Sequence, residues 1–292
     1  MKKILLGAML LTGTSLFAQD SAKTETPKPN PFSFSGYVEA FYQYDFNKPT
    51  DNNRPGFIYS HNRHNEFNLN LGFLKGSYNA ERVRANLAIA AGTYMNANYA
   101  AETGVLKNVY EANAGLKISK KKNLWIDAGI FSSHIGFESA VSKDCWTLTR
   151  SMLADNSPYF ESGAKLTYTS DNNKWVVSGL VLNGWQRIKR VDANSLMSYG
   201  TQLQYKPNSN ITLNYSTFIG TDKPDSARLW RYFHNVYGVI NVTGKFGITA
   251  GFDIGSEQKT KGSNDFNTWY SPVDLKICSN SKMDCCGKRR IL

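Results

Sequence analysis

Apolar and polar residues alternate along many segments of this chain, and a period of two residues predicts β-strands whose two faces differ. In residues 32–46, one face carries Phe34 and Val38 and the other carries Ser35 and Glu39. The pattern recurs clearly in residues 66–73, 82–91, 110–118, 124–130, 164–168, 199–205, 211–219 and 246–254, and in 175–185 and 229–241 it leaves the facing of the residues open. With a short last segment at 266–270, about twelve strands are visible.

The connections between these segments are alternately short and long. Residues 119–123, 170–173 and 206–210 form tight turns, whereas 47–65, 132–159 and 186–197 are long connections. Strands of about ten residues joined in this way match an all-β, antiparallel, up-and-down transmembrane β-barrel, which we predict over residues 32–272. The alternative is a soluble β-sandwich, in which the apolar face would be buried inside.

The N-terminus has the features of an export signal. Lys2 and Lys3 precede a short apolar run that ends at Ala18, and this arrangement predicts a signal peptide over residues 1–18 with cleavage after Ala18. Residues 19–31 are polar and rich in proline, and they predict a disordered periplasmic linker. We therefore expect export to the bacterial outer membrane.

Composition and charge narrow the class of protein. The chain has 16 Tyr, 16 Phe and 6 Trp, and its mean hydropathy is nevertheless negative. Transmembrane barrels combine aromatic belts with a polar interior in this way. The formal net charge of +11 is spread along the chain without a basic stripe, and no nucleic-acid-binding motif is present, so we expect no nucleic-acid partner.

Charged residues on the polar face of the predicted strands are the candidate pore-lining residues. Both signs occur among them, which predicts a weakly selective pore. The alternative is that they pair with one another inside a narrow barrel. The long connection 132–159 either folds into the interior or forms an extracellular flap. The candidates are Glu39, Arg82, Arg84, Glu111, Lys117, Asp127 and Lys165 from the strands and Arg150 from that connection.

Three stretches of the chain resemble one family. They are SGYVEAFYQYDF at 35–46, HIGFESAVSKDCWTLTRSMLADNSPYFESGAKLTY at 134–168 and LNGWQRI at 182–188, and they are similar to the OmpL-like β-barrel porin family, also called β-barrel porin type 2. The likeness extends over residues 32–272. It implies an outer-membrane barrel, in contact with lipid, through which small polar solutes or ions diffuse passively with weak selectivity. An oligomer is compatible with this expectation.

The end of the sequence departs from that family. Its members usually finish on a strand with a terminal aromatic residue, which the barrel assembly machinery recognises. Here residues 273–292 read as an irregular, truncated or frame-shifted tail, so we expect an incomplete barrel with an open seam between the first strand and residues 266–270. The tail holds Cys278, Cys285 and Cys286. A disulfide or metal site is the alternative reading, but the spacing fits no tetrahedral zinc signature, and we expect no metal or cofactor.

Two other classes of function are alternatives to a channel. A barrel hydrolase would need serine, histidine and an acid together, and the candidates His61, His64, His134 and His234 stand in no recognised catalytic motif. We therefore expect no enzyme. A surface binding or adhesion protein would use the barrel as an anchor and the long connections as contact sites.

Overall fold

A computed structural model describes residues 30–147, 149–243, 246–271 and 274–279. The predicted signal peptide and the linker up to residue 29 lie outside these residues. The described strands and helices all belong to one compact unit that begins at Pro31.

The unit is built on one antiparallel sheet in which each strand from β1 to β12 pairs with the next along the chain, and β13 pairs with β11. The predicted fold class, an all-β up-and-down sheet, is confirmed. Its strands are β1 (Phe32–Tyr42), β2 (Phe67–Asn79), β3 (Val83–Ala91), β4 (Val109–Lys117), β5 (Asn123–Ser132), β6 (Phe160–Thr169), β7 (Trp175–Leu182), β8 (Ser198–Asn208), β9 (Ile211–Gly220), β10 (Arg231–Thr243), β11 (Phe246–Gln258), β12 (Phe266–Tyr270) and β13 (Asp274–Ser279).

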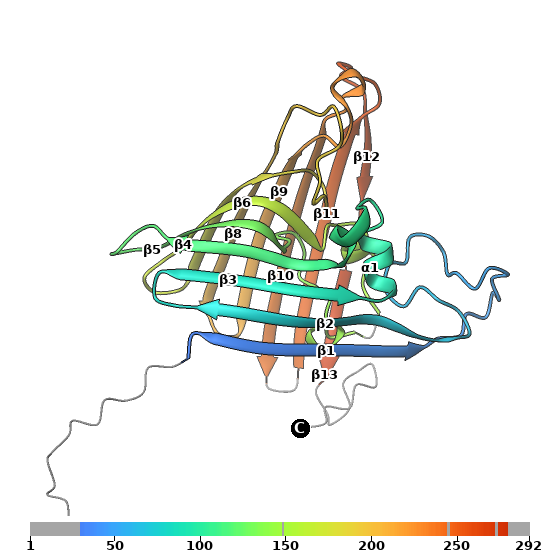
Figure 1. Ribbon diagram of the computed structural model, residues 1–292, viewed down its shortest axis with the longest axis horizontal. Helices are drawn as coiled ribbons and strands as arrows, with labels where there is room; N and C mark the ends of the chain where they lie inside the picture. Colours follow the sequence, from blue (N-terminus) through green and yellow to red (C-terminus); the bar gives the residue numbers. More distant parts are fainter. Residues whose placement is uncertain (1–29, 148, 244–245, 272–273, 280–292) are drawn as a thin grey trace, which may run out of the picture. The chain divides into compact units, whose positions relative to one another are not determined.

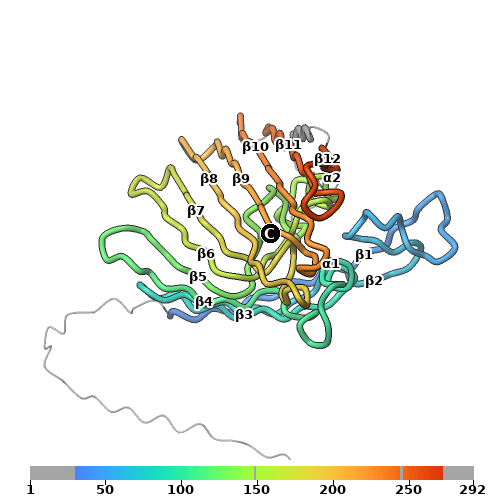
Figure 2. Tube along the Cα trace, turned by 90° about the horizontal axis from the view of Figure 1, so that it is seen from above, coloured from blue at the N-terminus to red at the C-terminus, as the bar shows by residue number. Residues whose placement is uncertain are grey.

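The sheet curves strongly from β1 round to β12, as Figures 1 and 2 show. Its strand order runs from β1 to β12, and these two strands do not pair with each other within the described residues. The predicted open seam between the first strand and residues 266–270 is therefore present in this structure. The concave face of the curved sheet is its inward face, and the opposite face points outward.

The segment after residue 272 is the main departure from prediction. Residues 274–279 form β13, which pairs with Phe246–Gly251 of β11, while β12 pairs with Ile254–Gln258 of the same strand. β12 and β13 thus follow β11 in the same direction, as one strand with an interruption. The expectation of an irregular tail is wrong for these six residues, and residues 280–292 lie outside the described residues. The interruption includes Pro272, a residue type with no N–H to donate to a neighbouring strand.

Apolar side chains cover the outward face. Leu87, Ile126 and Leu213 are exposed, and Phe34 is 85% exposed. The structure also shows which residues face outward in the two segments that the sequence left open. Buried and exposed residues alternate along β7 and the first half of β10. Other exposed residues on this face include Val38, Leu74, Ile89, Leu116, Leu166, Val177, Leu203, Tyr215 and Val236.

Aromatic rings gather at both ends of the outward face. One end has the short turns 80–82, 118–122, 170–174 and 209–210, and the other has the long connections. Such paired belts, with an apolar band between them, are typical of transmembrane barrels. The ring pairs are Phe32–Tyr78 and Trp175–Tyr205 at the short-turn end, and Tyr42–Phe67 and Tyr232–Phe266 at the long-connection end, with centroids 4.2–5.9 Å apart.

Two β-bulges place residues on the face opposite to the predicted one. Glu39 pairs with Leu71 and the next residue pairs with Leu69, so that Asn70 is an extra residue in β2. An extra residue reverses the facing of everything beyond it. Leu71 continues the two-residue spacing of Phe67 and Leu69, which predicts that it shares their face, but it is fully buried in the inward cluster around Tyr94. Tyr110 is the extra residue of β4 in the same way, and its ring stacks on the inward Phe73, 5.2 Å away.

Short helices lie in the long connections and do not interrupt the sheet. No helix in the described ranges is both long and apolar enough to span a membrane. The helices are α1 (Thr93–Asn98) and α2 (Met152–Asp155), with single 3-10 turns η1 (Gly104–Asn108), η2 (Ser142–Asp144) and η3 (Asp225–Ala227).

Candidate functional site: the inward face and the segment that crosses it

The inward face is polar, and its charges are unevenly distributed. β2 to β6 carry charged side chains of both signs, and β10 and β11 add Arg231, Asp253 and Glu257. The inward residues of β7 to β9 are amides, hydroxyls, glycines and apolar side chains. Several of these charges lie on nearby strands, where they can pair with one another. The charged set of β2 to β6 includes Lys75, Arg84, Glu111, Asp127 and Lys165, and the uncharged set includes Ser178, Gln202, Asn214, Ser216, Asn235 and Thr249.

Most charges in β2 to β6 are paired across strands. Arg84 donates to both carboxylate oxygens of Asp127, with Nε and Oδ1 2.6 Å apart, and its guanidinium lies 4.3 Å from the centroid of the Trp125 ring. Lys75 Nζ is 2.5 Å from a carboxylate oxygen of Glu111. Lys75 was not among the predicted residues, because the bulge in β2 hides the alternation that places it inward.

The remaining candidates from the strands make different kinds of contact. Glu39, on β1, accepts hydrogen bonds from His61 Nε2 and Asn70 Nδ2, each at 3.0 Å. Lys165 Nζ lies 4.6 Å from the centroid of the Phe131 ring. Arg82 occupies the turn before β3, where it donates to the backbone oxygen of Lys117 at the end of β4.

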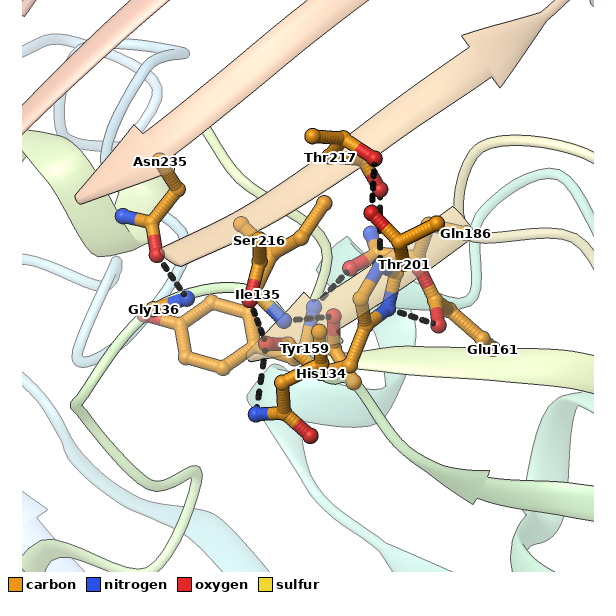
Figure 3. Close-up of polar contacts among 12 residues, drawn as sticks. His134, Ile135, Gly136, Tyr159, Glu161, Gln186, Thr201, Ser216, Thr217 and Asn235 are labelled. Carbon is orange, nitrogen blue, oxygen red and sulfur yellow. Dashed lines mark hydrogen bonds and ion pairs between the residues drawn. The ribbon is translucent and has the colours of Figure 1, made fainter. Parts of the chain in front are cut away.

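Residues 133–159, called here the in-folded segment, connect β5 and β6. Figure 3 shows the polar contacts that its first residues make with partners in the sheet. The two ends of the segment are joined, since Ser133 N donates to Tyr159 O at 3.0 Å. Between these ends it reaches strands that are far apart in the sheet. It contacts β8 to β11 near its start and the β1–β2 side near Val141. A connection can make both sets of contacts only by crossing the concave side.

His134 fastens the start of the in-folded segment. Its Nδ1 is 2.8 Å from Glu161 Oε2 on β6, and its Nε2 donates to Thr217 O on β9 at 2.8 Å (Figure 3). Its own carbonyl accepts from Ser216 Oγ and Gln202 Nε2. Burial alone would lower the pKa of His134, but the Glu161 carboxylate and the two ring hydrogen bonds raise it above its ordinary value. Glu161 is fully buried, and sequence reasoning did not single it out.

Glycines in β11 make room for two rings of the in-folded segment. A Cβ on Gly251 would lie 2.8 Å from the Phe137 ring, and one on Gly247 would lie 2.5 Å from Trp146. Further along, Ala140 and Val141 join the buried cluster of Leu71 and Tyr94. The segment is therefore packed against the sheet on both sides of the concave face.

Arg150, the candidate from the long connection, makes hydrogen bonds within the in-folded segment. Its guanidinium donates to Ser139 O at 2.8 Å, Ala140 O at 3.0 Å and Ser142 Oγ at 2.9 Å. Glu138 accepts from Ser151 at the start of α2. These bonds hold the segment in one compact conformation.

The histidines make structural contacts. In a serine hydrolase the Nε2 of the His–acid pair would face the nucleophile, but here Nε2 of His134 faces the Thr217 carbonyl. His61 donates to Glu39, and His64 Nδ1 accepts from Asp45 N. His234 contacts the Tyr215 hydroxyl on the outward face.

The metal and disulfide readings of the tail are not tested by side-chain geometry. Cys285 and Cys286 lie outside the described residues, and only the backbone of Cys278 is described, in β13. In the part of the chain that is described, no three His, Cys, Asp or Glu side chains gather in a way that could hold a metal ion. Cys145 is buried in the in-folded segment with its Sγ near Ser139 O and Val141 O.

A curved antiparallel sheet with an apolar outward face, aromatic belts and a polar inward face defines a protein of the membrane β-barrel class. Residues 31–281 match the sequence model of the family described as "Putative beta-barrel porin-2, OmpL-like", and the chain belongs to this family. The match extends beyond the predicted limit of residue 272 and includes β13. No curated protein matches the chain. Membership of a porin family indicates an outer-membrane location and a non-enzymatic role.

Proposed function

We propose that this protein is an outer-membrane channel through which small polar solutes and ions diffuse passively with weak selectivity. The observation that carries the proposal is the polar inward face, which the in-folded segment crosses. Paired charges on neighbouring strands largely cancel, so they favour neither cations nor anions strongly. The aromatic belts support contact of the outward face with membrane lipid.

The surface-adhesion alternative is less well supported. An adhesion protein would present its long connections to a partner, yet the in-folded segment is bound to the inward face through His134 and Phe137. The connection after β7 is also held, because Ile188 N donates to Glu102 at 2.8 Å. Two of the long connections are therefore engaged with the protein itself.

Ion selectivity in planar bilayers tests the proposal. Lys75→Gln with Arg84→Gln removes the cationic partners of Glu111 and Asp127, and the interior then becomes more negative. We expect a measurable current for the wild type and a reversal potential shifted toward cation preference for the double variant under a salt gradient. Lys122→Gln is the matched control, since Lys122 pairs with Asp171 at the exposed short-turn end. An unchanged reversal potential would contradict pore lining by these strands, and a complete absence of current would favour the anchor function.

A further inference from the structure

A polar cavity of about 490 Å³ opens at the long-connection end of the sheet. Its walls come from residues 97–101 after β3, from α2, from residues 185–187 after β7, and from the inward side of β10 and β12. A volume of this size lies within the range of small-molecule sites in proteins. Its position places it where a solute would enter the concave side.

Two tryptophan rings are held in the wall of this cavity. Trp269 of β12 lies against Gly255, where a Cβ would come within 2.3 Å of the indole. Trp185 is fixed by edge contacts with Phe218 and Phe233, with centroids 4.9 and 4.8 Å apart, and both indoles are half-buried. The rings therefore give the cavity rigid apolar surfaces within a largely polar wall.

Charged groups of both signs complete the wall. Arg231 is already engaged by Glu257 and Asp222, and its guanidinium lies 5.3 Å from the centroid of the Trp185 ring. Arg187, in contrast, donates no hydrogen bond to any residue in the described ranges, so its guanidinium can serve a ligand. Asp155 contributes a carboxylate from α2, and the Tyr159 hydroxyl donates to it at 3.3 Å.

This combination favours a neutral solute with many hydroxyl groups. A hydroxyl donates to a carboxylate such as Asp155 and accepts from a guanidinium such as Arg187. An anion would be repelled by the carboxylate, and a cation would be repelled by the guanidinium. An indole face suits the C–H side of a sugar ring, because the ring face carries partial negative charge. We propose that this cavity binds a neutral saccharide of one or two rings. The inference deepens the proposed channel function by naming a class of solute at its entrance.

Saturation-transfer NMR with maltose and the folded protein in detergent micelles tests the site. We expect saturable transfer to the ring protons of the sugar, and at least tenfold weaker binding of maltose by Trp269→Ala and by Arg187→Gln. Trp175→Ala is the matched control, since Trp175 belongs to the outward belt, and it should bind as the wild type does. Glucuronate and glucosamine should bind at least tenfold more weakly than glucose.

Heat-modifiable gel mobility identifies any variant that fails to fold. Arg187 is half-buried and makes no hydrogen bond to the described residues, so its variant is the more robust of the two. No transfer to maltose in the wild type, or equal transfer in both site variants, would overturn the inference. Bilayer current measured on the same preparation separates the two proposals. Current without maltose binding refutes the saccharide site and leaves the channel, whereas binding without current refutes the channel and leaves the site.

Discussion

His134 joins the in-folded segment to the sheet through both ring nitrogens. Because Nε2 faces a carbonyl oxygen, it must carry a hydrogen, and one further proton lies between Nδ1 and Glu161. The pair is nearly inaccessible to solvent, since the two side chains are 1% and 0% exposed. Removing one member of a buried pair leaves the other without compensation and costs roughly 3–5 kcal/mol.

This arrangement predicts a pH dependence of stability. The pKa of His134 is raised in the folded protein. The protonated His134 therefore contributes its full stabilisation of the fold below the unfolded pKa of about 6.5, and this stabilisation is lost as pH rises through the folded pKa. In that window the free energy of unfolding should fall by at most about 1.4 kcal/mol per pH unit. Urea unfolding in lipid vesicles between pH 6 and 9, followed by tryptophan fluorescence, measures it.

Glu161→Gln is the variant that isolates this effect. It should lower the free energy of unfolding by roughly 3–5 kcal/mol at pH 6 and remove the decline between pH 6 and 9. Lys122→Gln, at the exposed short-turn end, should change neither the urea midpoint of unfolding at pH 6 nor the decline of the free energy of unfolding with pH. If the free energy of unfolding depends on pH in the same way for the wild type and Glu161→Gln, the pKa of His134 is not raised by Glu161.

A glycine in β5 distorts the backbone of the β5–β6 pair close to the in-folded segment. Gly129 has a φ of +123°, a conformation that side chains rarely adopt, and a Cβ there would lie 2.1 Å from Ala112 O. It pairs with Gly163 on β6, close to the point where the in-folded segment begins. We infer that this local distortion lets the two strands turn their connection toward the concave side.

Substitution of this glycine tests the role of the hairpin. Gly129→Ala should reduce the free energy of unfolding by at least about 1–3 kcal/mol from backbone strain alone, with the clash against Ala112 added to it. Gly179→Ala in β7 is the matched control, because no atom lies within 4 Å of a Cβ at that position. Urea titration in vesicles compares the two. Equal midpoints for both variants would mean that the conformation of Gly129 is not required.

At the level of elements, the sequence pattern predicted the strands well and failed where the two-residue period is broken. β8, β9 and β11 face as predicted because no bulge lies within the predicted segments, and the register shift of β8 follows Tyr205. Asn70 and Tyr110 add one residue each. Neither leaves a mark in the pattern of apolar residues, because Asn70 stands between two leucines and Tyr110 keeps the two-residue spacing of Ala112 and Ala114. The alternation of Leu275 and Ile277 with Asp274 and Lys276 was present in β13, but it is short and follows a proline.

The contacts of the site were less predictable than the strands. The two-residue period and the charges identified Arg84 and Asp127 as inward residues. Their ion pair could not be predicted, because the two residues are 43 positions apart in the sequence. The inward direction of the in-folded segment depends on partners such as Thr217 and Asn235, which lie far along the chain. Sequence alone left the choice between an inward segment and an extracellular flap open.

At the scale of the whole molecule, the described sheet has two edges, one at β1 and one along β12 and β13. Unpaired backbone groups that face hydrocarbon cost several kcal/mol each, so these edges require partners in a membrane. Between the edges, the curved sheet encloses a polar side that the in-folded segment narrows. The proposed channel requires water and solutes to pass along this side.

Single-channel conductance in planar bilayers tests this central claim most directly. Residues 136–157 can be replaced by a short Gly-Ser turn, because the hydrogen bond between Ser133 N and Tyr159 O already joins the ends of the segment. With folding verified by heat-modifiable gel mobility, we predict a larger single-channel conductance for the shortened protein than for the full-length protein in the same salt. Equal conductance of the two proteins would contradict a passage along the inward face that the in-folded segment narrows.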